Sequence, residues 1–208
     1  LRRFHGWPAL SRLAVVAGDT APQQFIVEEV LPPMTATERS AIATLVMAGQ
    51  LDSELADLVG LPGTLLDLAM NIPLVDLDRD GSISAADLWS DVIDAVIEQP
   101  ERKRLAGVIG PWLAAAGRSG DAIGCAANAG LWSLAREFVM SAAAGGDPGI
   151  TPSATRQWLA HFPSDQLAEP ELVFLRGLHT RLLHGAGSGK DDVVNALAMF
   201  DERGMAEA

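Results

Sequence analysis

From Pro100 to the end, the sequence divides into short segments with the apolar spacing of helices, most of which end at a glycine. Leu172, Leu175, Leu178 and Leu182 form one such apolar stripe. Helices of this length joined by brief turns pack as antiparallel hairpins and stack into an array. We find no strict 34-residue period, so the sequence predicts a repeat-like array. The segments are ERKRLAGVIGPWLAAAG, SGDAIGCAANAG, LWSLAREFVMSAAA, SATRQWLAHF, PELVFLRGLHTRLLHG and KDDVVNALAMFDERG.

The first 73 residues are also mostly helical in pattern. A helix is predicted over 7–17, with Pro8 near its start, and APQQFIVEEVL predicts a second that stops at Pro32. The segment TATERSAIATLVMAG opens with a capping box from Thr35 to Glu38. DSELADLVG and PGTLLDLAMNI predict two further short helices.

One stretch instead alternates apolar and polar residues, which is the pattern of a β-strand. LVDLDRDGSISA, residues 74–85, predicts a β-hairpin with a three-residue loop, Arg79-Asp80-Gly81. This register pairs Asp78 with Ser82, Leu77 with Ile83, Asp76 with Ser84 and Val75 with Ala85, which separates apolar from polar faces. Asp87 is then predicted to cap the helix of DLWSDVIDAVIEQ.

The same acidic stretch also matches a calcium loop. Its oxygen ligands would be Asp76, Asp78, Asp80, the Ser82 carbonyl, Ser84 or a water, and Asp87, with Gly81 at the bend. Pro73 breaks any incoming helix, the last ligand is Asp rather than Glu, and only one such loop is present. We favour the hairpin, and a calcium-binding interaction module remains the alternative.

Charge and composition limit the partners. The 208 residues carry a formal net charge of −12, and residues 51–99 hold eleven acids and a single base, Arg79, a balance of −10. Such a stretch repels a phosphate backbone, so we expect no direct contact with nucleic acid. No apolar run reaches the length of a membrane span. The lone Cys125 allows no internal disulfide, which favours a cytoplasmic location.

No other motif predicts a site. GAGSGK at 185–190 resembles a phosphate loop, but His184 and Asp191 stand where glycine and serine or threonine are needed, so we interpret it as a turn. Histidines 5, 161, 179 and 184 lack ligand spacing, and Cys125 lies in an alanine-rich helix. The five tryptophans fall on predicted helices, as core residues do. With no nucleophile, base and orienting acid in view, we predict no enzyme activity in this chain.

Five stretches in order resemble the large ATP-dependent LuxR-type transcriptional activators, which are signalling ATPases. Each motif is weak alone, but together they cover nearly the whole chain. They are GWPALSRLA at 6–14, FIVEEVL at 25–31, NIPLVDLDRDG at 71–81 followed by DLWSDVI at 87–93, WLAAAGRSGDAIGCAANAGLWSLA at 112–135, and RQWLAHFPSDQLAEPELVFLRGL at 156–178.

The resemblance implies roles for two residues. Pro8 would lie against the adenine of ATP or ADP, and Asp87 belongs to a Met-His-Asp segment whose histidine reads the phosphates. This chain has Ala85-Ala86-Asp87 there, so the histidine is missing. The resemblance further implies an ATPase core before this region, a DNA-binding domain after it, and an inducer or protein partner on the repeats.

We therefore expect a mostly α chain with three parts: a helical segment (1–33), a winged-helix-like domain with one short β-hairpin (34–99), and the start of a TPR-like array of antiparallel helical hairpins (100–208). The expected function is regulatory coupling between nucleotide state and inducer or partner binding. A free-standing helical scaffold remains a second alternative, which would lack both flanking domains.

Overall fold

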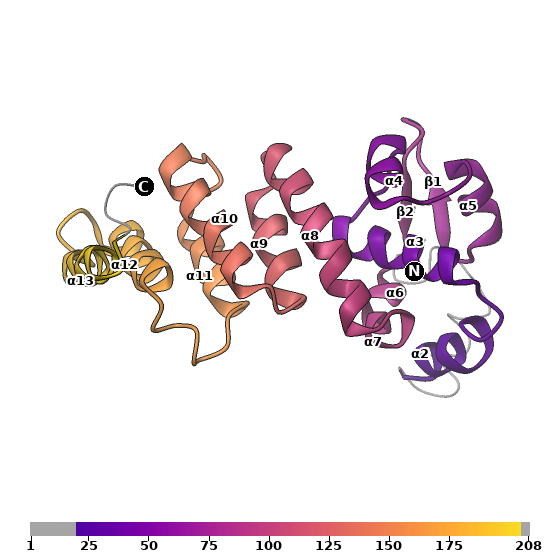
Figure 1. Ribbon diagram of the computed structural model, residues 1–208, viewed down its shortest axis with the longest axis horizontal. Helices are drawn as coiled ribbons and strands as arrows, with labels where there is room; N and C mark the ends of the chain where they lie inside the picture. Colours follow the sequence, from indigo (N-terminus) through magenta and orange to yellow (C-terminus); the bar gives the residue numbers. More distant parts are fainter. Residues whose placement is uncertain (1–19, 205–208) are drawn as a thin grey trace. The chain divides into compact units, whose positions relative to one another are not determined.

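The computed structural model describes residues 20–204, and the helix predicted over 7–17 lies outside this range. The chain divides into two compact units, and the division falls between Ile109 and Gly110, inside helix α8 (Gln99–Ala115). The fold is mostly α with one short hairpin, as expected from the sequence (Figure 1). The domain boundaries after residues 33 and 99 stay predictions.

The first unit begins with the second predicted helix. It is present as α2 (Ala21–Phe25) continued by a π-helical turn, η2 (Ile26–Val30), and it ends before Pro32. Ile26 is 1% exposed, so this segment contributes to the core of the unit. The Arg39 guanidinium donates to the Leu31 carbonyl at 2.6 Å, which satisfies an acceptor at the helix end.

Helix α3 (Ala36–Ala48) begins and ends at the predicted residues. Thr35 accepts from the Glu38 backbone N–H at 3.2 Å, and the Glu38 carboxylate accepts from the Thr35 N–H at 2.6 Å, which completes the capping box. Gly49, at φ +81°, ends the helix in the left-handed conformation. The buried side of α3, with Ile42 and Leu45, contacts β2, α6 and α7 and forms the centre of the unit.

Two short helices and the hairpin complete the first unit. Helix α4 (Ser53–Val59) and helix α5 (Leu65–Asn71) are followed by β1 (Val75–Leu77) and β2 (Ile83–Ala85), with the hairpin between α4 and α5 in Figure 1. Leu51, directly before α4, pairs with Ile83 through two backbone hydrogen bonds of 2.9 Å. This isolated bridge fixes the connection from α3 to α4 against β2.

The predicted hairpin register is confirmed. Val75 pairs with Ala85, Asp76 with Ser84 and Leu77 with Ile83. The Asp78 N–H donates to the Ser82 carbonyl at 2.8 Å, and Gly81 supplies the left-handed residue at φ +84°.

The segment after the hairpin corrects two predictions. Asp87 is not the cap: Ala86 holds that position without a side-chain bond, and Asp87 is the first residue of α6 (Asp87–Asp91). The carboxylate still lies in the first turn, where the helix dipole favours it. The single helix predicted for 87–99 is broken at Val92 (φ −118°, ψ +11°), so α7 (Ile93–Val96) is separate. Trp89 of α6 and Val96 of α7 are both buried, and both helices contact α3.

All six helices predicted after Pro100 are present. A constant offset relates them in pairs: α9, α11 and α13 each begin 20 residues after the start of α8, α10 and α12. Within the second unit α10 lies beside α12 and α9 beside α11, as in a stacked array. The bounds are α9 Ser119–Asn128, α10 Trp132–Gly145, α11 Pro152–Ala160, α12 Pro170–His184 and α13 Lys190–Glu202.

Glycines set the close contacts between stacked helices. A Cβ on Gly110 would lie 2.9 Å from the Phe138 ring, and one on Gly120 would lie 3.0 Å from Trp158 Nε1. A Cβ on Gly124 would likewise lie 3.2 Å from His161 Nε2. Each large ring thus fills a notch that only glycine leaves open, which is how alternate helices interlock.

Candidate functional site

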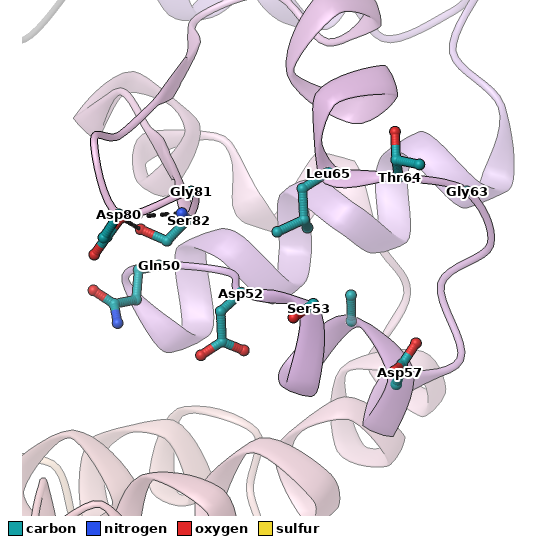
Figure 2. A pocket seen from close by; sticks show the side chains of 11 residues that line it. Gln50, Asp52, Ser53, Asp57, Gly63, Thr64, Leu65, Asp80, Gly81 and Ser82 are labelled. Atoms are coloured by element: carbon teal, nitrogen blue, oxygen red, sulfur yellow. Dashed lines mark hydrogen bonds between the residues drawn. The ribbon is translucent and has the colours of Figure 1, made fainter.

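A groove in the first unit lies beside the tip of the hairpin (Figure 2). It has a volume of about 560 Å³. Asp80, Gly81 and Ser82 of the hairpin turn lie next to Gln50 and Asp52 of the connection from α3 to α4. The remaining lining comes from α4 and from the residues that lead into α5: Ser53, Ala56, Asp57, Gly63, Thr64 and Leu65.

Local hydrogen bonds position these side chains. The Leu51–Ile83 bridge holds the α3–α4 connection against the hairpin. Asp52 caps α4 by accepting from the Leu55 N–H at 2.8 Å. Thr64 caps α5 by accepting from the Asp67 N–H at 3.1 Å. The groove is therefore bordered by the first turns of two helices and the hairpin turn.

The groove is acidic, and two of its three carboxylates already have partners. Asp80 accepts from the Ser82 hydroxyl at 2.7 Å and from the Ser82 N–H at 3.0 Å, and these bonds lower the pKa of Asp80. Asp52 is engaged as a helix cap, and Asp57 is exposed on α4. The lining holds no base, so the groove suits a cationic group more than an anionic one.

The structure distributes the predicted calcium ligands along the hairpin. Asp76 and Ser84 lie opposite each other, Asp78 begins the turn, Asp80 bonds back to Ser82, and Asp87 starts α6. Between residues 20 and 204, no three His, Cys, Asp or Glu side chains are grouped so that they could hold a metal ion. Calcium binding at Asp76, Asp78, Asp80, Ser82 and Asp87 stays a prediction of the alternative.

A thermal melt separates the two interpretations of this loop. The hairpin account expects the same midpoint in millimolar calcium and in chelator, because Asp80 is already bonded to Ser82. A ligand at a hundred times its Kd that binds only the folded state would add about 2.7 kcal/mol. A calcium-dependent rise that disappears in Asp78→Ala would establish a metal site and contradict the hairpin account.

The other candidates from the sequence have structural roles or lie outside the description. Pro8 is outside residues 20–204, so its contact with adenine stays a prediction. Cys125 is buried in α9, and burial raises the pKa of its thiol to about 12, which leaves no thiolate at neutral pH. His179 Nδ1 lies 2.8 Å from the buried Thr155 hydroxyl, a link between α12 and α11.

His161 gives the second unit a pH-dependent contact. Its ring packs over Gly124, and burial lowers the pKa of His161 below the usual value of about 6.5. The native state therefore binds this proton less tightly than the unfolded state. We expect the stability from this contact to be complete above pH 6.5 and to be lost as the pH falls toward the lower, folded-state pKa. Urea unfolding at pH 7.5 and 5.5 measures this loss, which His161→Asn should reduce; an equal loss in both proteins would contradict it.

No family model, no curated protein and no solved structure matches this chain. In residues 20–204, no helix is long and apolar enough to cross a membrane.

Sequence reasoning missed most of the groove. Asp52 and Thr64 could have been found, because each precedes a helical segment at the capping position. Gln50, Ser53 and Asp57 carried no signal, since only the Leu51–Ile83 bridge brings their segment to the hairpin. Of the predicted residues, Asp80 and Ser82 line the groove, while Asp76, Asp78 and Asp87 are not among its lining.

Proposed function

We propose that this chain is the regulatory coupling region of a cytoplasmic, ATP-dependent transcription regulator of the LuxR type. It would link the nucleotide state of an ATPase core to the binding of an inducer or protein partner. One observation carries the proposal: a winged-helix-like unit is followed directly by stacked helical hairpins, in the order of the five motifs of the sequence. Fold alone would not assign this role, so the resemblance is a necessary second support.

The charge of the first unit supports a protein contact over DNA recognition. In a DNA-binding winged helix, the second helix of the helix-turn-helix enters the major groove. The corresponding helix here, α5, has the sequence LLDLAMN, with one acid and no base. Binding to a phosphate backbone requires lysine or arginine, so this unit is proposed to dock on the ATPase core of the same polypeptide.

Asp87 is the proposed nucleotide-side residue of this unit. It is exposed at the first position of α6, directly after the hairpin. Because Ala86 stands where the LuxR-type activators have a histidine, the contact with the nucleotide phosphates would be weaker than in those proteins. We therefore propose that the contact between this unit and the ATPase core contributes most of the coupling, and that direct contacts to ATP or ADP contribute little.

The second unit has room for a small inducer. A cavity of about 370 Å³ lies where α9 begins and α10 ends, within the size range of small-molecule pockets. Phe138 and Ala142 give it an apolar wall, and Ser119 and Asp147, joined by a 2.6 Å hydrogen bond, give it a polar edge. A ligand there would bridge two successive hairpins, which is a route to biasing the array between two states.

The coding sequence on either side of this region tests the proposal. A phosphate-binding loop with its Gly-Lys-Ser or Gly-Lys-Thr upstream, and a helix-turn-helix downstream, are expected. A parent protein that encodes neither would favour the free-standing scaffold and remove the proposed function. A gel-shift assay with the chain alone should show no binding to duplex DNA at 100 mM salt.

A further inference from the structure

Helix α5 turns apolar side chains outward. Leu66 is 53% exposed and Met70 is 77% exposed, while Leu68 on the opposite side is buried. Residues four apart lie next to each other on one face of a helix, so Leu66 and Met70 form a continuous ridge. Exposed apolar surface of this kind is typical of interaction sites, and methionine adapts well to a partner's shape.

Strand β1 carries a third exposed apolar side chain, Leu77. Leu77 is 49% exposed and pairs with Ile83, which is fully buried. Directly paired residues in an antiparallel hairpin point to the same face, so Leu77 lies on the helix-covered face of the hairpin. Helix α5 contacts β1, so the exposed Leu77 lies on the strand next to this helix. We call Leu66, Met70 and Leu77 the α5 face.

The charges around the α5 face limit what can cover it. Asp67 lies in α5 itself and Asp76 lies on β1, and from residue 51 to 78 every ionisable side chain is an acid. Nucleic acid and anionic membranes would be repelled. A second copy of the chain would bring one acidic surface against another, which costs association free energy. A cationic protein surface is the complementary partner.

We propose that the α5 face binds a basic amphipathic helix of a protein partner. The apolar stripe of that helix would cover Leu66 and Met70, and its lysine and arginine side chains would face the surrounding carboxylates. A ridge of residues four apart packs into the groove of a second helix, which makes a helix the fitting shape. This inference rests on the docking role in the proposed function and adds the surface and the chemistry of the partner.

The test uses the full chain and a labelled 18-residue helical peptide of leucine and lysine, followed by fluorescence anisotropy. We expect a Kd in the micromolar range and at least a tenfold weaker Kd for the double variant Leu66→Ser, Met70→Ser. The matched control is Leu183→Ser with Leu197→Ser, two residues of the second unit that are 52% and 54% exposed. Because all four side chains are exposed, neither variant should unfold, and circular dichroism melts check this.

Three further arms make the outcome decisive. Raising salt from 50 to 500 mM should weaken binding, and a peptide with glutamate in place of lysine should not bind. Vesicles containing phosphatidylserine should not bind either. Absence of lysine-peptide binding, equal loss in both double variants, equal binding of the glutamate peptide, or vesicle binding would overturn the inference. Flanking sequence without the ATPase motifs would instead remove the proposed function while leaving this peptide binding intact.

Discussion

Replacing Gly189 with alanine is expected to destabilise the second unit by roughly 2–4 kcal/mol. Gly189 caps α13 at φ +72°, a conformation that costs an alanine free energy. A Cβ there would also overlap the Gly177 carbonyl in the backbone of α12, which cannot move aside as a side chain could. Urea unfolding followed by tryptophan fluorescence measures the loss.

Two glycines of the same loop separate these causes. Gly185 has φ +95° and ψ 175°, a conformation nearly exclusive to glycine, but open space around its Cβ position, so Gly185→Ala should cost only a conformational part of about 1–3 kcal/mol. Gly187 has neither restriction, so Gly187→Ala should be neutral within about 0.5 kcal/mol. Equal effects at 187 and 189 would contradict the close packing of α12 on α13. The motif that resembles a phosphate loop is thus a packing turn.

Replacing Trp89 with alanine is expected to destabilise the first unit by about 3–5 kcal/mol. The ring is fully buried in α6, and its Nε1 donates to the Pro73 carbonyl at 3.0 Å. The next carbonyl, that of Leu74, accepts from the Ala86 N–H at 2.9 Å. Trp89 therefore fixes the chain where it enters β1, and its loss should open the hairpin as well as leave a cavity.

Trp89→Phe tests the hydrogen bond separately from the volume. It keeps most of the buried ring but leaves the Pro73 carbonyl without this donor, so a smaller loss of about 1–3 kcal/mol is expected. Denaturant midpoints with an unchanged slope would show that both variants act on stability alone. A loss below 1 kcal/mol in Trp89→Ala would contradict the central place given to this side chain.

Local chemistry explains why much of the first unit could be predicted. The capping box of Thr35 with Glu38 and the hairpin loop ending at Gly81 depend on residues within four positions of each other. The cap at Asp87 was wrong because the hairpin sets where α6 begins, one residue earlier than the side-chain pattern indicates. The groove could not be predicted, since the bridge from Leu51 to Ile83 joins residues far apart in the sequence.

The period of the helical array could not be predicted from the sequence either. Each pair of helices keeps its 20-residue offset, but the pairs begin at residues 99, 132 and 170, so their spacing changes from 33 to 38. The longer connection between α11 and α12 hides the period from a search at fixed length. Aromatic residues that fill glycine notches, such as Phe138 on Gly110, hold the stack together and have no fixed sequence spacing.

The most direct test of the coupling role is the affinity of this chain for the ATPase core of its parent protein, measured by calorimetry in ADP and in ATP. The account predicts affinities that differ at least tenfold between the two nucleotides, a coupling free energy of about 1.4 kcal/mol or more. Leu66→Ser with Met70→Ser should weaken the tighter of these two interactions, and Leu183→Ser with Leu197→Ser should not. Equal affinity in both nucleotides, or no binding in either, would contradict the account.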